Sequence, residues 1–377
     1  MKKGIKKFLG LGLALTLVAS SFVGCSSKDG DTFLIGGIGP LTGEAASYGI
    51  SVKQGAEIAI KEINDAGGVS VGDKKIKLDF RFEDDVALPD NAKTAFNTLM
   101  DAGMDALMGT VTSGAGLGII DLTKEEGILT LTPSGSAAGL TEHDNAFRLC
   151  FTDPLQGVTM ANFAKEAGYT KIAIIYNNSD DYSTGVMQAF TDQVAANGGQ
   201  IVASEAFAEG NVDFATQLTS IKATDAEVIF IPAYYGAVAY ITTQAADLGM
   251  KLPFLGSDGW DGVIAQTVDP SVLEGSIFLT PFFASDEAAK VQSFVKKYEE
   301  AYKATPDQFA ADGYDSIYVI AAAIEKAGST QSADLIAAMT QIEVDGLTGY
   351  MTFTADGEPN KGANFVQIVN GEYTALK

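Results

Sequence analysis

The sequence has few of the residues that most often carry catalysis, metals or cross-links. Its 377 residues include one histidine, two cysteines and one tryptophan. A zinc site built from histidine and cysteine needs three or four such ligands, so the count excludes one and we expect no metal. Cys25 ends an N-terminal apolar run, which leaves Cys150 without a partner for an intramolecular disulfide. Cys150 lies in the apolar stretch "FRLCF", where buried packing is expected rather than nucleophilic chemistry.

Basic residues are also scarce. The chain has 25 Lys and Arg against 48 Asp and Glu, a formal charge of −23. Nucleic acid is therefore not an expected partner, because binding it requires clustered basic side chains. The simplest reading of the acidic surplus is solubility.

Only the N-terminus contains a long apolar run. Four lysines in the first seven residues precede "FLGLGLALTLVASSFVG", which ends at Cys25. This pattern is typical of a secretory signal, too short for a stable membrane span. "FVGC" resembles a bacterial lipobox with Cys25 as the lipidated residue, although Phe22 departs from the usual leucine. We expect a signal peptide over 1–24, a flexible tether over 25–31, and a lipid anchor at the outer face of the cell membrane.

Strand-like and helix-like segments alternate through most of the chain. The apolar patterns predict strands at "TFLIGGIGP", "KIKLDFRFED", 104–109 and "ILTLTP", with helices at 49–66, 90–102 and from about 114. A second round predicts strands at "KIAIIY", "QIVASEAF", "EVIFIP", "PFLG" and "SIFLTPF", with helices at 155–167, 182–197, 213–222 and 237–248. Such alternation indicates parallel sheets covered by helices on both faces. The expected fold is α/β, with two doubly wound parallel-sheet lobes.

The C-terminal part breaks this rhythm. Helices are expected at 286–304, 309–327 and 332–341, followed by strand-like runs "GYMTFTADG" and "ANFVQIVNG". We expect the helices to cover the first lobe and the last strands to join the second, so that several crossings form a hinge. The predicted boundaries are 32–153 with 283–345 for lobe 1, and 154–282 with 346–377 for lobe 2.

Four glycine-rich segments follow predicted strands, and ligands of open α/β sheets bind beyond the carboxyl ends of strands. These segments are "GPLTGEAASYG", "GTVTSGAG", "TPSGSAAG" and "GSDGWDG". Ser113 stands where a helix is expected to begin, a position that favours an anion. Ser113 could equally serve as a plain helix cap.

No nucleotide or catalytic motif accompanies these segments. The glycines lack the spacing of a phosphate-binding loop, and Pro40 interrupts the dinucleotide-like "GGIGPLTG". A hydrolase would depend on the single histidine, His143, which lies in the polar stretch "TEHDN", and no "GxSxG" elbow is present. The residues thus support neither a cofactor nor an enzyme.

A binding cleft accounts for more of these residues. Ser134 and Ser136 offer hydroxyl groups, and Asp258 offers a negative charge at a strand end. Opposite Ser113, these groups would complement a zwitterion, with its carboxylate at Ser113 and its ammonium at Asp258. Aromatic residues at strand ends or helix starts could wall a side-chain pocket, although each could equally be core packing: Tyr48, Tyr182, Tyr234, Tyr235, Trp260 and Phe309.

From residue 32 onward the chain resembles the type I periplasmic binding proteins that serve ABC transporters for branched-chain amino acids. The resemblance rests on the order and spacing of "GPLTGEAASYGISVKQGAEIAIKEINDAGGV", "GILTLTPSGSAAGLT", "IAIIYNNSDDYSTG", "IPAYYG" and "FLGSDGWDG". It implies two lobes joined by a multi-strand hinge, with a ligand captured between them.

The resemblance also implies roles for matching positions. Ser113 and Ser136 would anchor the ligand's carboxylate and amino group beside the backbone of Ser134 and Gly135, and Asp258 takes the place of an acidic partner for the ammonium. Asp258 is one methylene shorter than the glutamate often found there. The implied aromatic contacts are Tyr48 from the first lobe, Tyr182 and one of Tyr234 or Tyr235 from the second, and Phe309 at the pocket floor.

The expected function is therefore an extracytoplasmic, lipid-anchored, monomeric substrate-binding protein of an ABC importer. It would capture an aliphatic amino acid and deliver it to a membrane permease. Alternatives are the same fold binding an amide, a urea or an aromatic acid, an extracellular hydrolase, and a signalling receptor domain.

Overall fold

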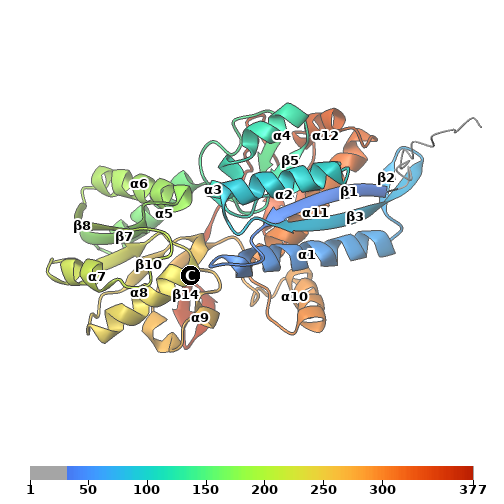
Figure 1. Ribbon diagram of the computed structural model, residues 1–377. Helices are drawn as coiled ribbons and strands as arrows, with labels where there is room; N and C mark the ends of the chain where they lie inside the picture. The colour runs from blue at the N-terminus through green and yellow to red at the C-terminus, as the bar shows by residue number, and fades with distance from the viewer. Residues whose placement is uncertain (1–31, 377) are drawn as a thin grey trace, which may run out of the picture. The chain divides into compact units, whose positions relative to one another are not determined.

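A computed structural model of the chain describes residues 32–376, and the first of its two large sheets comes mainly from the N-terminal part (Figure 1). This sheet has the order β2-β3-β1-β4-β5-β6. Its strands are β1 (Thr32–Gly39), β2 (Val69–Val71), β3 (Lys74–Asp84), β4 (Ala106–Gly109), β5 (Thr130–Thr132) and β6 (Ala146–Arg148). All neighbours are parallel except β2, which pairs antiparallel with β3.

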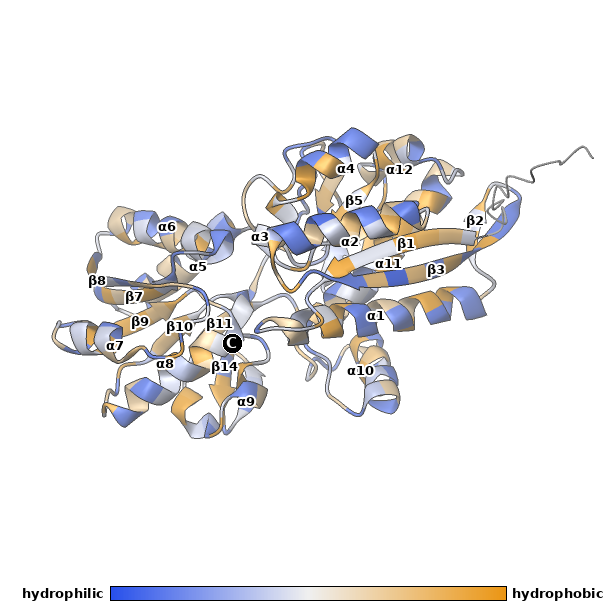
Figure 2. Ribbon diagram, in the orientation of Figure 1, coloured by the Kyte–Doolittle hydropathy of each residue, from blue (hydrophilic) through white to orange (hydrophobic). Residues whose placement is uncertain are grey.

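Helices cover both faces of the first sheet, as expected for a buried parallel sheet. Phe33 and Ile35 of β1 pack with α1 (Ala46–Asp65) and α11 (Gln308–Ala327), whereas Ile38 packs with α2 (Pro89–Asp101). The remaining helices of this part are α3 (Ser113–Leu117), α4 (Ile120–Glu126), α10 (Ala289–Tyr302) and α12 (Ser332–Met339). Figure 2 shows the consequence of this burial: the strands are largely hydrophobic, whereas helices such as α2 are hydrophilic on part of their surface.

The second sheet has the order β15-β14-β11-β10-β9-β7-β8. Its strands are β7 (Lys171–Asn177), β8 (Gln200–Phe207), β9 (Val228–Ile231), β10 (Phe254–Gly256), β11 (Ile277–Thr280), β14 (Asn364–Val369) and β15 (Glu372–Ala375). β14 and β15 are antiparallel to their neighbours, and the other pairs are parallel.

Helices also cover both faces of the second sheet. Ile174 packs with α5 (Asp153–Glu166) and α6 (Asp181–Ala196), and the adjacent Ile175 packs with α7 (Ala215–Lys222) and α8 (Tyr235–Asp247). Short turns follow β10, namely the 3-10 helix η1 (Asp258–Trp260), α9 (Val263–Gln266) and the 3-10 helix η2 (Pro270–Leu273). The alternation predicted from the sequence is confirmed in both sheets.

Several details differ from the sequence-based expectation. The helix expected from about 114 is two short helices, α3 and α4, and the strands β2, β6 and β15 were not predicted. The run "GYMTFTADG" does not join the second sheet, so its predicted pairing was wrong. Its strand β13 (Gly349–Met351) pairs instead with β12 (Val344–Gly346) in a separate hairpin. The lobe boundaries stay a prediction.

Between residues 32 and 376, none of the helices combines the length and the apolar character that a membrane crossing requires. The expected signal peptide, the tether and Cys25 lie outside the described residues.

Candidate functional site

Residues that follow the carboxyl ends of strands in both sheets meet around one small cavity. Its free volume is about 10 Å³, room for about one water molecule. The lining residues are Tyr48, Val111, Thr112, Ser113, Ser134, Ser136, Tyr182, Tyr234, Asp258, Gly259 and Phe309. Most of the predicted site residues therefore share one enclosed space, including Ser113 from the first sheet and Asp258 from the second.

On the first-sheet side, Ser113 is oriented by two backbone hydrogen bonds. Its Oγ accepts the N–H groups of Ser136 and Ala137, each at 3.1 Å. A hydroxyl has one hydrogen to donate and two lone pairs. Because both lone pairs are engaged, the hydrogen is left to donate to an acceptor in the cavity. Ser113 is the first residue of α3 and Thr112 is the N-cap, so the alternative that Ser113 caps this helix does not describe its contacts.

Ser134 has the opposite arrangement. Its hydroxyl donates to the carbonyl oxygen of Val111 at 2.7 Å, which leaves its lone pairs as acceptors. The neighbouring Gly135 does not line the cavity. Its N–H donates to Thr132 Oγ1 at 2.8 Å and its carbonyl accepts from Arg148 Nη1 at 3.2 Å, so it shapes the loop that holds Ser134 and Ser136.

On the second-sheet side, the carboxylate of Asp258 is buried and held by Tyr182. The Tyr182 hydroxyl lies 2.7 Å from Asp258 Oδ1 and 2.5 Å from Ser257 Oγ, and it accepts the N–H of Gly259 at 2.9 Å. Burial raises the pKa of Asp258 to about 6, against the lowering effect of the hydrogen bond from Tyr182. A buried carboxylate of this kind is suited to receive an ammonium group.

Aromatic rings form the rest of the wall. The ring of Tyr48 lies 4.1 Å from that of Phe309 and 5.5 Å from that of Tyr234, measured between centroids. Tyr234 in turn stacks on Tyr182 at 5.0 Å. These rings provide apolar surface beside the polar groups, the combination found in small-molecule sites.

Tyr48 also joins the two halves of the site. Its hydroxyl donates to the carbonyl of Gly259 at 2.5 Å and accepts the N–H of Tyr235 at 3.0 Å. Tyr48 belongs to α1 on the first sheet, whereas Gly259 and Tyr235 follow strands of the second sheet. Both bonds therefore depend on the two sheets staying close together at this point.

Tyr235 and Trp260 do not line the cavity. The Tyr235 hydroxyl accepts the N–H of Ser47 at 3.2 Å, and the Trp260 Nε1 donates to the carbonyl of Ile231 at 2.8 Å. Trp260 is fully buried and packs against Phe278, so it is a core residue of the second lobe.

The structure adds Val111, Thr112 and Gly259 to the cavity wall. Val111 and Thr112 stand beside Ser113 in "GTVTSGAG", and Gly259 follows Asp258. Their position next to predicted site residues is the feature of the sequence that could have identified them. Gly259 contributes its backbone, and a Cβ there would lie 2.9 Å from the Tyr182 hydroxyl.

A larger cavity of about 340 Å³ shares Thr112 and Tyr234 with the small one. Four acidic residues, Glu44, Asp180, Asp181 and Glu209, are part of its lining, together with apolar residues such as Leu88 and Phe207. Lys, Arg and His are absent from the described residues that line it. This adjoining cavity therefore disfavours ligands with a net negative charge.

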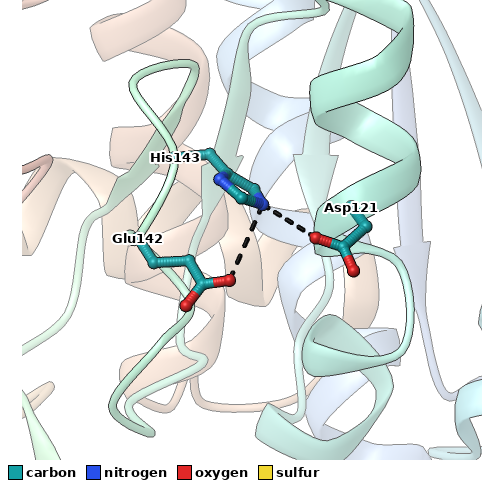
Figure 3. Close-up of side chains that lie close together, drawn as sticks. All are labelled: Asp121, Glu142 and His143. Atoms are coloured by element: carbon teal, nitrogen blue, oxygen red, sulfur yellow. Dashed lines mark hydrogen bonds and ion pairs between the residues drawn. The ribbon is translucent and has the colours of Figure 1, made fainter.

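His143 is engaged elsewhere. Its Nε2 lies 2.8 Å from Asp121 Oδ1 and 3.6 Å from Glu142 Oε1, in a cluster between α4 and the loop before β6 (Figure 3). His143 lines neither of the two cavities described above. The Ser-His arrangement that the hydrolase alternative requires is therefore not formed at Ser113, Ser134 or Ser136 in the described chain.

Comparison with known proteins places this geometry in a family. A family model described as periplasmic binding protein matches residues 32–372. The chain is 30% identical to "Leu/Ile/Val-binding protein homolog 3" of Brucella melitensis, over 87% of this chain and 88% of that protein. It is also 30% identical to "Leu/Ile/Val-binding protein BraC3" of Rhizobium johnstonii, over 92% of this chain and 93% of that protein.

A solved structure agrees with these sequence matches. The branched-chain amino acid transporter substrate-binding protein LivJ of Streptococcus pneumoniae, in complex with isoleucine, superposes with a TM-score of 0.84 at 29% identity, covering 92% of this chain and 100% of that one. The fold, the cavity between the two sheets and the sequence matches agree: this chain belongs to the periplasmic binding protein family.

Proposed function

We propose that this protein captures an aliphatic amino acid between its two sheets and delivers it to the permease of an ABC importer. The family acts outside the cytoplasm, and relatives at 30% identity carry the name Leu/Ile/Val-binding protein. The LivJ structure of similar fold contains isoleucine. These names support, for this chain, a ligand with an aliphatic side chain.

The single observation that carries the proposal is the opposite polarity of the two sides of one cavity. Ser113 presents a hydroxyl hydrogen on the first-sheet side, and Asp258 presents a buried carboxylate on the second-sheet side. An α-amino acid carries a carboxylate and an ammonium on one carbon, so it matches both groups at once. Tyr48, Tyr234 and Phe309 then offer the apolar surface for an aliphatic side chain, and the walls have to move apart from the present arrangement, whose free volume is about 10 Å³, to admit it.

Binding is coupled to closure because the two sides come from different sheets. A ligand that touches both Ser113 and Asp258 makes its full set of contacts only when the sheets are close together. The Tyr48 bonds to Gly259 and Tyr235 favour the same arrangement. The ligand thereby shifts the equilibrium toward the closed form, and no covalent bond in the ligand changes.

The same proposal includes a lipid anchor at Cys25 and a monomeric protein that contacts its permease from outside the cell membrane. The support is the signal-like N-terminus with its lipobox-like "FVGC". Amides, ureas and aromatic acids remain alternative ligands of the same cavity. Aromatic acids are disfavoured because such a ligand has no cationic group to pair with the Asp258 carboxylate.

A thermal-shift panel on residues 26–377 tests the ligand class. At about 100 times the dissociation constant, a bound ligand adds about 2.7 kcal/mol to the free energy of unfolding. We expect leucine, isoleucine and valine to raise the melting temperature. Glutamate and aspartate should leave the melting temperature unchanged, because four acidic residues line the adjoining cavity. If all three aliphatic amino acids have no effect while an amide, a urea or benzoate raises the melting temperature, the proposed ligand is wrong.

A further inference from the structure

Asp121, Glu142 and His143 form a surface cluster that the proposed function does not use (Figure 3). One oxygen of each carboxylate and one ring nitrogen of His143 lie within 4.8 Å of one another. Asp121 belongs to α4, whereas Glu142 and His143 belong to the loop between β5 and β6. Both carboxylates are exposed and His143 is partly buried, so solvent ions can reach the cluster. Two separate segments thus bring three side chains of metal-ligating type together.

Contacts below the cluster hold the loop against α4. Asn145, two residues after His143, is 1% exposed. Its Nδ2 donates to Thr123 Oγ1 of α4 at 3.2 Å and to the carbonyl of Ile128 at 2.9 Å. The carbonyl of His143 accepts the N–H of Ala146 at 3.0 Å. The backbone that carries His143 is therefore fixed beside α4 by contacts other than those of its own ring.

Two carboxylates converge on one nitrogen atom of the imidazole. His143 Nε2 lies 2.8 Å from Asp121 Oδ1 and 3.6 Å from Glu142 Oε1. A ring nitrogen carries at most one hydrogen, which the nearer carboxylate can accept. The hydrogen on Nε2 therefore does not bind all three groups together, whereas a metal ion between them can contact each of them.

The distances in the cluster are those of neighbouring ligands around a metal ion. Ligand atoms about 2.1 Å from a metal lie about 3.0 Å apart at right angles and about 3.4 Å apart at tetrahedral angles. The two distances from His143 Nε2, 2.8 and 3.6 Å, are close to these values. When the ring hydrogen is on Nδ1, the lone pair of Nε2 is available to a metal.

The charges around the cluster also favour a divalent cation. Asp121, Glu142 and the adjacent Asp144 bring three negative charges, and Lys124, which pairs with Asp144, brings one positive charge. With a neutral His143 these groups have a net charge of −2, which follows from three carboxylates and one ammonium. A divalent cation balances this charge.

We propose that Asp121, Glu142 and His143 bind a divalent transition-metal ion such as Zn²⁺, which clamps the loop between β5 and β6 to α4. One imidazole nitrogen with two carboxylate oxygens suits Zn²⁺, whereas Ca²⁺ and Mg²⁺ prefer sites made of oxygen atoms alone. The scarcity of histidine and cysteine excludes a site built from those two residue types, but it does not exclude this one.

The clamp acts on a loop that also serves the cavity. The loop between β5 and β6 contains Ser134 and Ser136, which line the cavity, near its start and His143 near its end. None of the three proposed ligands lines either cavity described above. Metal binding is therefore independent of the proposed function, and a protein that binds no amino acid still tests it.

Calorimetric titration of Zn²⁺ into the metal-free protein, without a polyhistidine tag, tests the site. We expect one Zn²⁺ per chain. Loss of an outer-shell partner alone costs about 10- to 100-fold in metal affinity, so His143→Gln and Asp121→Asn should each weaken Zn²⁺ binding at least about tenfold. The matched control is Asp247→Asn on the exposed surface of α8, which should bind Zn²⁺ as the wild type does. Wild-type Zn²⁺ affinity in His143→Gln would overturn the proposal.

Competition with Mg²⁺ separates a built site from a general attraction of cations to acidic surface. An excess of Mg²⁺ should leave Zn²⁺ bound, because Mg²⁺ gains little from an imidazole ligand. Displacement of Zn²⁺ by an equal concentration of Mg²⁺ would show that the cluster only attracts positive charge, and the proposal would be wrong.

The single histidine allows a direct observation of the ligand. In protein labelled with ¹³C at histidine, the imidazole signal can come only from His143. One equivalent of Zn²⁺ should shift this signal, and the shift should require more Zn²⁺ in Glu142→Gln. An imidazole signal that one equivalent of Zn²⁺ leaves unchanged would contradict the proposal, whatever the protein binds in its cleft.

Discussion

At the residue scale, the polarity of the cleft depends on where individual hydroxyl hydrogens point. Ser113 and Ser134 have the same side chain, yet two backbone N–H groups occupy the lone pairs of one and a backbone carbonyl takes the hydrogen of the other. The sequence suggested both residues as ligand contacts because they follow predicted strands. It could not assign their donor and acceptor roles, because those are set by loop segments that meet only in the folded chain.

Replacing Asp258 by asparagine should abolish most amino-acid binding while preserving the fold. The substitution removes the charge that meets the ammonium, and a hydrogen bond to a charged group contributes about 1.5–3 kcal/mol. We expect leucine affinity to fall about 10- to 100-fold in isothermal titration calorimetry. Circular dichroism should be unchanged, and Asp247→Asn serves as the control. Unchanged affinity would remove Asp258 from the site.

The Tyr48 hydroxyl should matter for closure more than for stability of the individual lobes. In Tyr48→Phe the ring remains, but Gly259 O and Tyr235 N lose their partner. Since these bonds join the two sheets, the closed form is destabilised and leucine affinity should fall about tenfold. Tyr302→Phe is a matched control, because that hydroxyl contacts Gln54 and Glu57 of α1 instead. Equal affinities in the two variants would mean that Tyr48 does not contribute to closure.

The aromatic residues show the limit of sequence reasoning at this scale. Tyr48, Tyr182, Tyr234 and Phe309 line the cavity, whereas Trp260 packs in the core and Tyr235 lies beside the site. All six stand near strand ends or helix starts, so their sequence environments are alike. Only the direction of each side chain in the fold decides whether it lines the cavity or packs in the core.

At the element scale, the first lobe depends on a very close approach of α1 and α11. A Cβ on Gly55 would lie 1.8 Å from the carbonyl oxygen of Ala310, and a Cβ on Gly313 would lie 2.1 Å from that of Val52. The two helices therefore touch through their backbones at these glycines. This contact places Phe309, at the start of α11, against Tyr48 of α1 in the cavity wall.

Gly55→Ala should separate these helices and destabilise the protein. Overpacking of this kind costs about 1–3 kcal/mol, and the obstacle here is backbone, which cannot rotate away. We expect a fall of about 3 kcal/mol in the free energy of unfolding, measured by urea titration. Gly362→Ala has open space around its Cβ and should leave stability close to the wild-type value. Similar stability in both variants would contradict the account of the helix contact.

The regular part of the topology was predictable because apolar strands alternate with amphipathic helices. The three-residue strands β2 and β6 were not, since so short a run gives no periodic signal. "GYMTFTADG" carries a strand pattern, but pattern alone does not choose a pairing partner. Here the neighbouring β12 takes that role, and the second sheet receives β14 and β15 instead.

At the scale of the whole molecule, the cleft and its surroundings hold several buried carboxyl groups whose pKa values are raised by burial. Burial raises the pKa of Asp85 and of Asp180 to about 7, and that of Asp258 to about 6. Burial also raises the pKa of Asp153 and of Asp312. In the unfolded chain an aspartate has a pKa of about 3.9. Between these values the folded protein binds more protons than the unfolded protein.

The unliganded protein should therefore become more stable as the pH falls from 8 to 5.5. Stabilisation from these groups is lost as the pH rises through their pKa values in the folded protein. The free energy of unfolding therefore falls with rising pH, whereas for an ion-paired aspartate it rises. We expect Asp85 and Asp180, whose pKa values are about 7, to contribute about 2 kcal/mol each to this gain in the free energy of unfolding, which urea titration measures. Asp180→Asn should make the free energy of unfolding depend less steeply on pH. Stability that rises with pH would contradict the burial of these groups.

In the proposed function, one amino acid bridges Ser113 of the first sheet and Asp258 of the second. A crystal structure of the protein with bound leucine tests it most directly. We expect the ligand carboxylate at the Ser113 hydroxyl and the ammonium within hydrogen-bonding distance of the Asp258 carboxylate. The side chain should lie against Tyr48 and Phe309. Leucine bound outside the cavity between the sheets, or bound there with its carboxylate facing Asp258, would contradict it.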